Sequence, residues 1–149
     1  MLRPILIGIL SGQRALTPIA TVAEAARRGV LPPENGAPAL LTHPLVAAGL
    51  AAVAAGELGG DKMPSAPNRT VPSGLIARSL TAAVAGAALV PRERRVAGAA
   101  VATAAAVATS FIGLHLRLRA MRRWGQTGTG LVEDALIVGG SAAVVNARR

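Results

Sequence analysis

The chain has 149 residues, enough for one domain, but hydrophobic residues make up 52% of it, charged residues only 15%, and the mean hydropathy is +0.48. Phe and Trp occur once each and Tyr is absent, so any core must be built from small side chains, which favours tightly packed transmembrane helices over the alternative of a soluble alanine-rich bundle. The chain contains no cysteine, which excludes disulfides and thiolate metal sites.

The net charge of +9 comes from sixteen basic residues against seven acidic ones. The basic residues gather in short clusters between apolar runs, as juxtamembrane arginines do near anionic headgroups. Nucleic-acid binding is the weaker interpretation of this charge, and we expect a lipid bilayer as the partner instead. The clusters are Arg27–Arg28, Arg92–Arg95, Arg117–Arg123 and Arg148–Arg149.

Five apolar segments follow one another, at residues 4–26, 43–58, 73–90, 96–116 and 131–147. A bilayer core of ~30 Å takes about 20 helical residues, so the first and fourth segments are long enough and the others must borrow flanking residues. Pro72 and Pro91 bound the third segment, and the four prolines of residues 29–44 exclude a regular helix there. The pattern predicts an all-α polytopic membrane bundle of four to five spans, with residues 1–149 forming a single integral-membrane domain.

The first segment contains the stretch SGQRALTP, in which Gly12 and Pro18 both weaken a helix. Irregular backbone at membrane depth is tolerated only where it is buried in protein or lines a cavity, so we expect this segment to be broken or re-entrant. A half-helix N-terminus beside Arg14 would favour an anion, and Thr17 would add a hydroxyl. The simpler alternative is that Thr17 bonds back to a carbonyl and Pro18 only kinks the helix.

Residues 11–26 resemble residues 73–88, since both contain Ser-Gly and then Arg-x-Leu-Thr before a run of small residues. The resemblance suggests a duplicated two-helix unit, and chance similarity in so biased a composition is the alternative. Membrane orientation stays open: five spans divide the flanking basic residues seven against seven, and four spans divide them eight against six.

Ionisable side chains fall within or beside the apolar segments. A charge at the centre of a lipid-facing helix costs about 2.5–3.5 kcal/mol, so such residues normally face a partner or water. Glu57 and Asp61 would share a face of a continuing helix and repel, and Gly59 and Gly60 favour a tight turn there, before Pro64. The charges predict a buried ionic network; the alternative is that each side chain reaches the interface and fixes a helix end. The candidate polar site comprises Arg14, Thr17, Glu57, Asp61, Lys62, Arg69, Arg78, Glu133 and Asp134.

The spacing of these residues matches no dedicated metal motif, and His43 and His115 lie far away in sequence, so we expect neither a metal nor a cofactor. No nucleophile elbow, phosphate-binding loop or zinc-protease motif is present, which favours a protein that is not an enzyme.

Several motifs together resemble the bacterial integral-membrane family called domain of unknown function 4126. The family pattern is G-x-R-x-x-T-P near the start, then E-x-x-x-D-K-x-P-x-x-P-x-R, then a late E-D, and the resemblance would cover nearly the whole chain. It implies a multi-pass protein of the bacterial inner membrane without an assigned activity. The matching positions are Gly12, Arg14, Thr17, Pro18, Glu57, Asp61, Lys62, Pro64, Pro67, Arg69, Arg78, Glu133 and Asp134.

Three functions fit this sequence. The first is a transporter or channel for a small ion or solute, in which carboxylates couple to protons or cations and arginines hold an anion; a bundle this small would form a homo-oligomer to enclose a pathway. The second is a membrane-embedded enzyme acting on a phospholipid or polyprenyl phosphate. The third is a structural or assembly protein whose ionic network fixes helix register.

Overall fold

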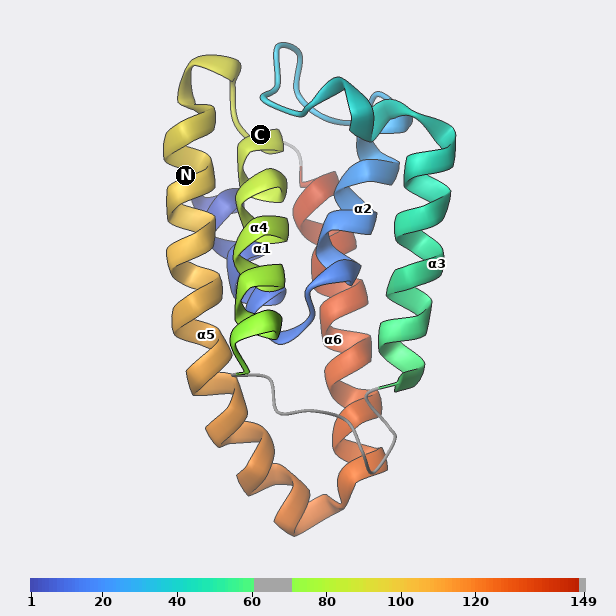
Figure 1. Cartoon of the computed structure of the whole chain (residues 1–149), viewed down its shortest axis with the longest axis vertical. Coiled ribbons are helices and arrows are strands. Elements are labelled where there is room, and N and C mark those ends of the chain that lie inside the picture. Colours follow the sequence, from blue (N-terminus) through green and yellow to red (C-terminus); the bar gives the residue numbers. More distant parts are fainter. Residues whose placement is uncertain (61–70, 148–149) are drawn as a thin grey trace.

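The computed structural model describes residues 1–60 and 71–147, and these form six α-helices (Figure 1). Candidate residues Asp61, Lys62, Pro64 and Arg69 lie outside the described residues. The helices are α1 (Leu2–Gln13), α2 (Leu16–Arg27), α3 (Pro44–Gly60), α4 (Pro72–Ala88), α5 (Arg95–Trp124) and α6 (Gln126–Asn146), with 3-10 turns η1 (Ala39–Thr42) and η2 (Arg92–Arg94) between them. The prediction of an all-α fold is confirmed for this part of the chain.

Two helical stretches are long and apolar enough to cross a membrane: Arg92–Trp124, which includes η2 and α5, and Gln126–Asn146, which is α6. α5 continues through the arginine cluster that was predicted to follow the fourth segment, and α6 begins five residues before the predicted fifth segment. Between them, Gly125 adopts a φ of 76°, a conformation that favours glycine, and the chain reverses direction there.

The first apolar segment is broken, as predicted, but the break lies at Arg14 and Ala15 rather than at Gly12 or Pro18. Pro18 is the third residue of α2, a position whose backbone N–H has no hydrogen-bond partner within a helix, so the missing N–H costs nothing there. Gly12 lies within α1, where a Cβ would come within 2.5 Å of the Ala106 carbonyl oxygen of α5. Gly12 therefore permits close helix contact, and the break comes from the residues after it.

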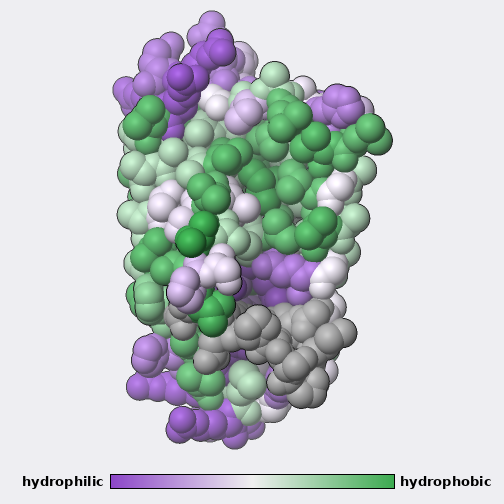
Figure 2. All heavy atoms as spheres, in the orientation of Figure 1, coloured by the Kyte–Doolittle hydropathy of each residue, from purple (hydrophilic) through white to green (hydrophobic). Residues whose placement is uncertain are grey.

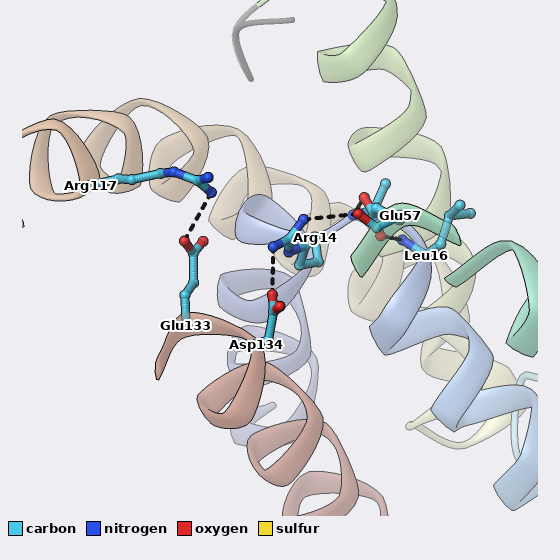
Figure 3. Close-up of polar contacts among 7 residues, drawn as sticks. Arg14, Leu16, Glu57, Arg117, Glu133 and Asp134 are labelled. Atoms are coloured by element: carbon cyan, nitrogen blue, oxygen red, sulfur yellow. Dashed lines mark hydrogen bonds and ion pairs between the residues drawn. The ribbon is translucent and has the colours of Figure 1, made fainter. Parts of the chain in front are cut away.

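α1 and α2 run in opposite directions, so the chain doubles back at the break. The start of α1 and the end of α2 reach the same end of α6, because Arg3, Val30 and Val145 line one groove. Arg3 also donates hydrogen bonds to the carbonyls of Val144 and Val145, at 3.0 and 2.8 Å. The break itself lies deep in the bundle, beside the middle of α6 (Figures 1 and 3).

The helices pack through small side chains at four-residue spacing. The buried face of α5 consists of Gly98, Ala102, Ala106, Ser110 and Gly113. Against it lie Gly8 of α1, whose added Cβ would come within 2.3 Å of the Ala102 oxygen, and Gly86 of α4, whose added Cβ would come within 2.5 Å of the Gly98 oxygen. Close backbone contact through Gly, Ala and Ser is how helices associate where the surroundings are as apolar as their side chains.

The distribution of large and polar side chains is the reverse of that in a soluble bundle. About half of the core residues are Ala and the rest are Ile, Val and Leu, whereas most large apolar side chains on α5 and α6 are exposed, among them Phe111, Ile112 and Leu136. Figure 2 shows hydrophilic side chains at two ends of the molecule and a mainly hydrophobic zone between them, with one hydrophilic patch inside it. An exposed apolar zone this extensive marks a surface that contacts lipid or protein.

Two further expectations from the sequence are wrong. Gly59 and Gly60 do not end the second segment in a turn, because α3 continues through Gly60. The two segments that resemble each other also differ in structure: residues 11–26 contain the break, whereas residues 73–88 form one continuous helix, α4. The structure therefore gives no support to a duplicated two-helix unit at these positions.

Candidate functional site

The break between α1 and α2 carries the most deeply buried charge in the described part of the chain. Arg14 is 2% exposed and has extended backbone angles, so its guanidinium extends from the end of α1 into the bundle. Its Nη2 donates a hydrogen bond of 2.5 Å to Oδ1 of Asp134 on α6, and its Nη1 donates one of 3.3 Å to the backbone carbonyl of Glu57 on α3 (Figure 3). One side chain thus connects three helices.

The carboxylate of Glu57 occupies the N-terminus of α2. Its two oxygens accept hydrogen bonds from the backbone N–H groups of Ala15 and Leu16, at 2.8 and 3.0 Å. These N–H groups have no partner within α2, and a negative charge there is favoured by the helix dipole. The anion site that the sequence predicts beside Arg14 therefore exists, but the protein's own carboxylate fills it.

Arg14, at the end of α1, contacts the end of α3, and Glu57, on α3, contacts the start of α2. The Glu57 carbonyl lies in the last turn of α3, the end of a helix at which a cation is favourable. Arg14 supplies that cation while Glu57 supplies the anion for α2. The two contacts therefore stabilise the end of α3 and the start of α2 together.

Glu133 and Asp134 are neighbours on α6 but face different helices. Asp134 is 8% exposed and faces Arg14, whereas Glu133 accepts a hydrogen bond of 3.2 Å from Nη1 of Arg117 on α5 (Figure 3). Successive residues on a helix point about 100° apart, which lets adjacent carboxylates join two different neighbours. In these contacts two arginines meet two carboxylates, whereas the carboxylate of Glu57 accepts from the backbone N–H groups of Ala15 and Leu16.

Two other candidates are also buried. Arg78, on α4, is 9% exposed and takes part in a polar interaction. Thr17, in the first turn of α2, has a buried hydroxyl with no hydrogen-bond partner in the described part of the chain, so it does not bond back to a carbonyl. Of the predicted residues, Arg14, Glu57 and Asp134 are brought together directly, and Glu133 lies beside them.

Arg117 is a member of the site that sequence reasoning missed, because it was assigned to a juxtamembrane cluster. Arg117 lies eight residues before Gly125 and Glu133 eight residues after it. Residues at equal distances from the turn of an antiparallel hairpin lie at similar depth, so this symmetry could have identified the pair.

A second charged cluster lies at the other end of α2. Glu24 accepts hydrogen bonds from Arg27 at 2.8 Å and from Arg28 at 2.5 Å, and the three side chains are 37%, 40% and 65% exposed. The hydrogen bond from Arg27 and then that from Arg28 lower the pKa of Glu24 from 4.5 to about 2. These residues are three and four apart on one helix, so the cluster is local.

The site holds buried charges at a fixed point between α2, α3 and α6. Within residues 1–60 and 71–147, no three His, Cys, Asp or Glu side chains gather as metal ligands would. The groups present are guanidinium, carboxylate and a helix N-terminus, which in proteins form charge-assisted hydrogen bonds.

No protein-family model matches the sequence, and comparisons with curated proteins and with solved structures gave no match either.

Proposed function

We propose that this protein is a multi-pass protein of the bacterial inner membrane, with α3, α4, α5 and α6 as four spans and α1–α2 as a re-entrant hairpin. We further propose that it is a transporter or channel for a small ion or solute. Its polar site would be the hairpin tip, which is the break at Arg14 and Ala15, together with Glu57 and Asp134. The resemblance to the domain of unknown function 4126 family stays a prediction and is consistent with the location.

The reversed burial supports the membrane location. Large apolar side chains are exposed along α5 and α6, while Arg14, Asp134 and Ser141 are buried. Lipid tails solvate the former, whereas charged residues inside a membrane face the bundle and pair with one another.

The depth of the break is the observation that carries the functional proposal. Asp134, which holds Arg14, lies 12 residues before Asn146, the end of α6 at which the hairpin enters. At 1.5 Å per residue this is roughly 18 Å, about half of a bilayer including part of its headgroup region. A broken helix with charged residues at that depth is the arrangement by which transporters bind substrates and coupling ions.

The pairs at the tip indicate how such a site would work. Glu57 holds the N-terminus of α2 as a substrate anion would, and Asp134 balances Arg14. A solute anion that displaced the Glu57 carboxylate would release α3 from the N-terminus of α2, and a proton or cation that neutralised Asp134 would release one contact of Arg14. Either change would let the hairpin tip move. The present contacts correspond to a closed state in this scheme.

Flux measurements on reconstituted vesicles test this proposal. Glu57→Gln and Asp134→Asn keep side-chain shape while removing charge, and Glu24→Gln is the matched control at the exposed end of α2. We expect the first two variants to lose at least tenfold in flux of a proton, alkali cation, chloride or phosphate gradient while the control retains it. If the wild-type protein moves none of these, or if both tip variants move them normally, the transport proposal is wrong.

A structural role is the second candidate, because Arg14, Asp134 and Glu57 all have partners within the bundle. In that case reversing a pair, with Arg14→Asp and Asp134→Arg together, recovers the fold and whatever the protein supports in the cell. The burial of Arg14 and Asp134 disfavours a membrane-embedded enzyme acting on a lipid phosphate, because the arginines of such an enzyme would have to be open to lipid.

A further inference from the structure

A groove lies under the loop of residues 36–39, at the end of the molecule where the chain passes from α4 to α5 (Figure 1). We call it the loop groove. Its volume is about 390 Å³, within the range of about 300–1,000 Å³ that is usual for small-ligand sites. Its walls are small and apolar, from Ala83 and Val84 on α4 and Ala99 on α5.

The loop over this groove is held in place through the backbone. The N–H of Gly36 donates a hydrogen bond to the Val90 carbonyl, and the N–H of Arg92 donates one to the Glu34 carbonyl, both at 2.8 Å. A Cβ on Gly36 would come within 2.5 Å of the Ala87 carbonyl oxygen, so a glycine is needed for the loop to lie this close to α4. The loop groove is therefore built by specific contacts.

The charged residues that line the loop groove are both arginines. Arg92 of η2 and Arg95 of α5 are three residues apart, and Ala99 follows four residues later, so all three lie on one face. Glu93 lies between the arginines in sequence but does not line the groove. Neither Arg92 nor Arg95 forms an ion pair within residues 1–60 and 71–147.

Three other grooves of the described chain hold arginines that already have partners. The groove between α5 and α6 is lined by Arg117 and Glu133, which face each other. The groove over α2 is lined by Glu24 and Arg28, which are also paired. In the groove at the end of α6, Arg3 donates to backbone carbonyls. Of these four, the loop groove alone has two arginines and no acid in its lining, which fixes the sign of its ligand.

We propose that the loop groove binds one anionic phospholipid, with the phosphate on Arg92 and Arg95 and the upper part of an acyl chain against Val84 and Ala99. Guanidinium groups bind phosphate oxygens in preference to other anions of less suitable geometry. The apolar walls accept the chain of an amphiphile, which a free anion lacks.

The position of the loop groove favours a lipid as the source of the phosphate. Arg92 is the first residue of the stretch Arg92–Trp124, which is long enough to cross a membrane, so it would lie at the level of the headgroups. Ala99 is seven residues further on, roughly 10 Å deeper. Figure 2 shows hydrophilic side chains at this end of the molecule, next to the mainly hydrophobic zone.

The site rests on the proposed insertion of the protein into a membrane and not on transport. None of the residues that line it belongs to the hairpin tip, so the loop groove can be altered without changing the buried charges. Each arginine near an anionic surface contributes roughly fivefold in affinity, so two arginines predict roughly a 25-fold preference for an anionic lipid over a zwitterionic one.

Native mass spectrometry of the full chain, purified in detergent, counts bound lipids directly. Phosphatidylglycerol and phosphatidylcholine with the same acyl chains are titrated separately, and excess glycerol phosphate is then added to the phosphatidylglycerol complex. We expect one phosphatidylglycerol to bind at a concentration at least tenfold lower than phosphatidylcholine and to remain bound in glycerol phosphate. Equal affinities for the two lipids would overturn the proposal, and displacement by glycerol phosphate would assign the groove to a free anion instead.

Two changes separate the arginines from the apolar walls. Arg92→Gln with Arg95→Gln should abolish the preference for phosphatidylglycerol. The matched control is Arg119→Gln with Arg122→Gln, a second pair of exposed arginines three residues apart, near the other end of α5 and outside this groove. Ala83→Leu fills the groove from α4 and should weaken phosphatidylglycerol binding about tenfold although both arginines remain.

Unfolding in detergent should be the same for both double variants and the wild type, because all four arginines are exposed. A preference for phosphatidylglycerol that persists in the Arg92 and Arg95 double variant, or that is lost equally in the control, contradicts the site.

These outcomes are distinguishable from those of the flux experiment. Selective lipid binding without flux supports the lipid site and rejects transport, whereas flux without lipid selectivity does the opposite.

Discussion

The two ends of α2 hold their charges in different ways. At its N-terminus, Glu57 and Asp134 reach the hairpin tip from positions 42 and 120 residues away, and the arginine between them is buried. At its C-terminus, Glu24 meets Arg27 and Arg28 on one face of the helix, and all three side chains are at least one-third exposed. Both clusters contain short hydrogen bonds, yet only the first joins separate helices.

The difference shows that burial and sequence separation, and not the shortness of a bond, decide what an ion pair contributes. Removal of one partner from a buried pair leaves a charge without compensation, at a cost of about 3–5 kcal/mol. An exposed pair on one helix contributes about 0.3–0.5 kcal/mol and is screened by salt. The charges at the hairpin tip should therefore contribute strongly to the free energy of unfolding, whereas the outer cluster of Glu24, Arg27 and Arg28 should contribute little.

The largest effect is expected from Asp134→Ala. This variant removes the carboxylate that Arg14 faces and should destabilise the protein by about 3–5 kcal/mol, measured by unfolding in detergent. The double variant Arg14→Met with Asp134→Leu removes both charges and should recover most of that loss. If Asp134→Ala is as stable as the wild type, the buried pair contributes no more to stability than the exposed cluster does, and the comparison fails.

Gly12→Val tests whether close helix packing holds the tip in place. An added Cβ would meet Oγ1 of Thr109 at 2.1 Å and the Ala106 oxygen at 2.5 Å, so α1 must move away from α5. We expect a loss of about 1–3 kcal/mol by the same unfolding assay, as for other overpacked sites. Gly139→Ala is the control, because its Cβ meets no atom within 4 Å; equal losses in the two would contradict the role of Gly12.

Glu57→Gln should have a moderate effect on stability. The amide keeps one acceptor for the N–H groups of Ala15 and Leu16 but loses the charge that the N-terminus of α2 favours. Losses at helix caps are about 0.5–2 kcal/mol, and hydrogen exchange at Ala15 and Leu16 should accelerate with them. Unchanged exchange at both amides would show that Glu57 does not cap α2.

Glu24→Gln should have the smallest effect. The folded-state pKa of about 2 lies below the ordinary value of 4.5, so the contribution of Glu24 is present above pH 4.5 and is lost as the pH falls through about 2. Because the carboxylate is exposed, the melting temperature of the variant should match that of the wild type at pH 7 and in 1 M salt. A large loss at pH 7 would mean that the outer cluster fixes the end of α2 after all.

The sequence predicts the helices better than it predicts their ends and contacts. The five apolar segments, the prolines at 72 and 91 and the break in the first segment indicate where helices form, because hydrophobicity and helix breakers are local properties. The location of the break at Arg14, the continuation of α3 through Gly60 and the partner of Glu133 depend instead on segments distant in sequence. Glu57 was identified as a candidate from its charge, but its role at the start of α2 required a second helix to be in place.

Sided chemical labelling tests the central claim, that α1–α2 enters and leaves the membrane on one side with its tip at the buried charges. The chain has no cysteine, so Leu2→Cys and Arg28→Cys each provide a single thiol, at exposed positions at the two ends of the hairpin. In sealed vesicles of known orientation, a membrane-impermeant maleimide should label both variants from the same side and should leave Leu136→Cys, on the apolar face of α6, unlabelled. Labelling of Leu2→Cys and Arg28→Cys from opposite sides would contradict the re-entrant hairpin and with it the position of Arg14 inside the membrane.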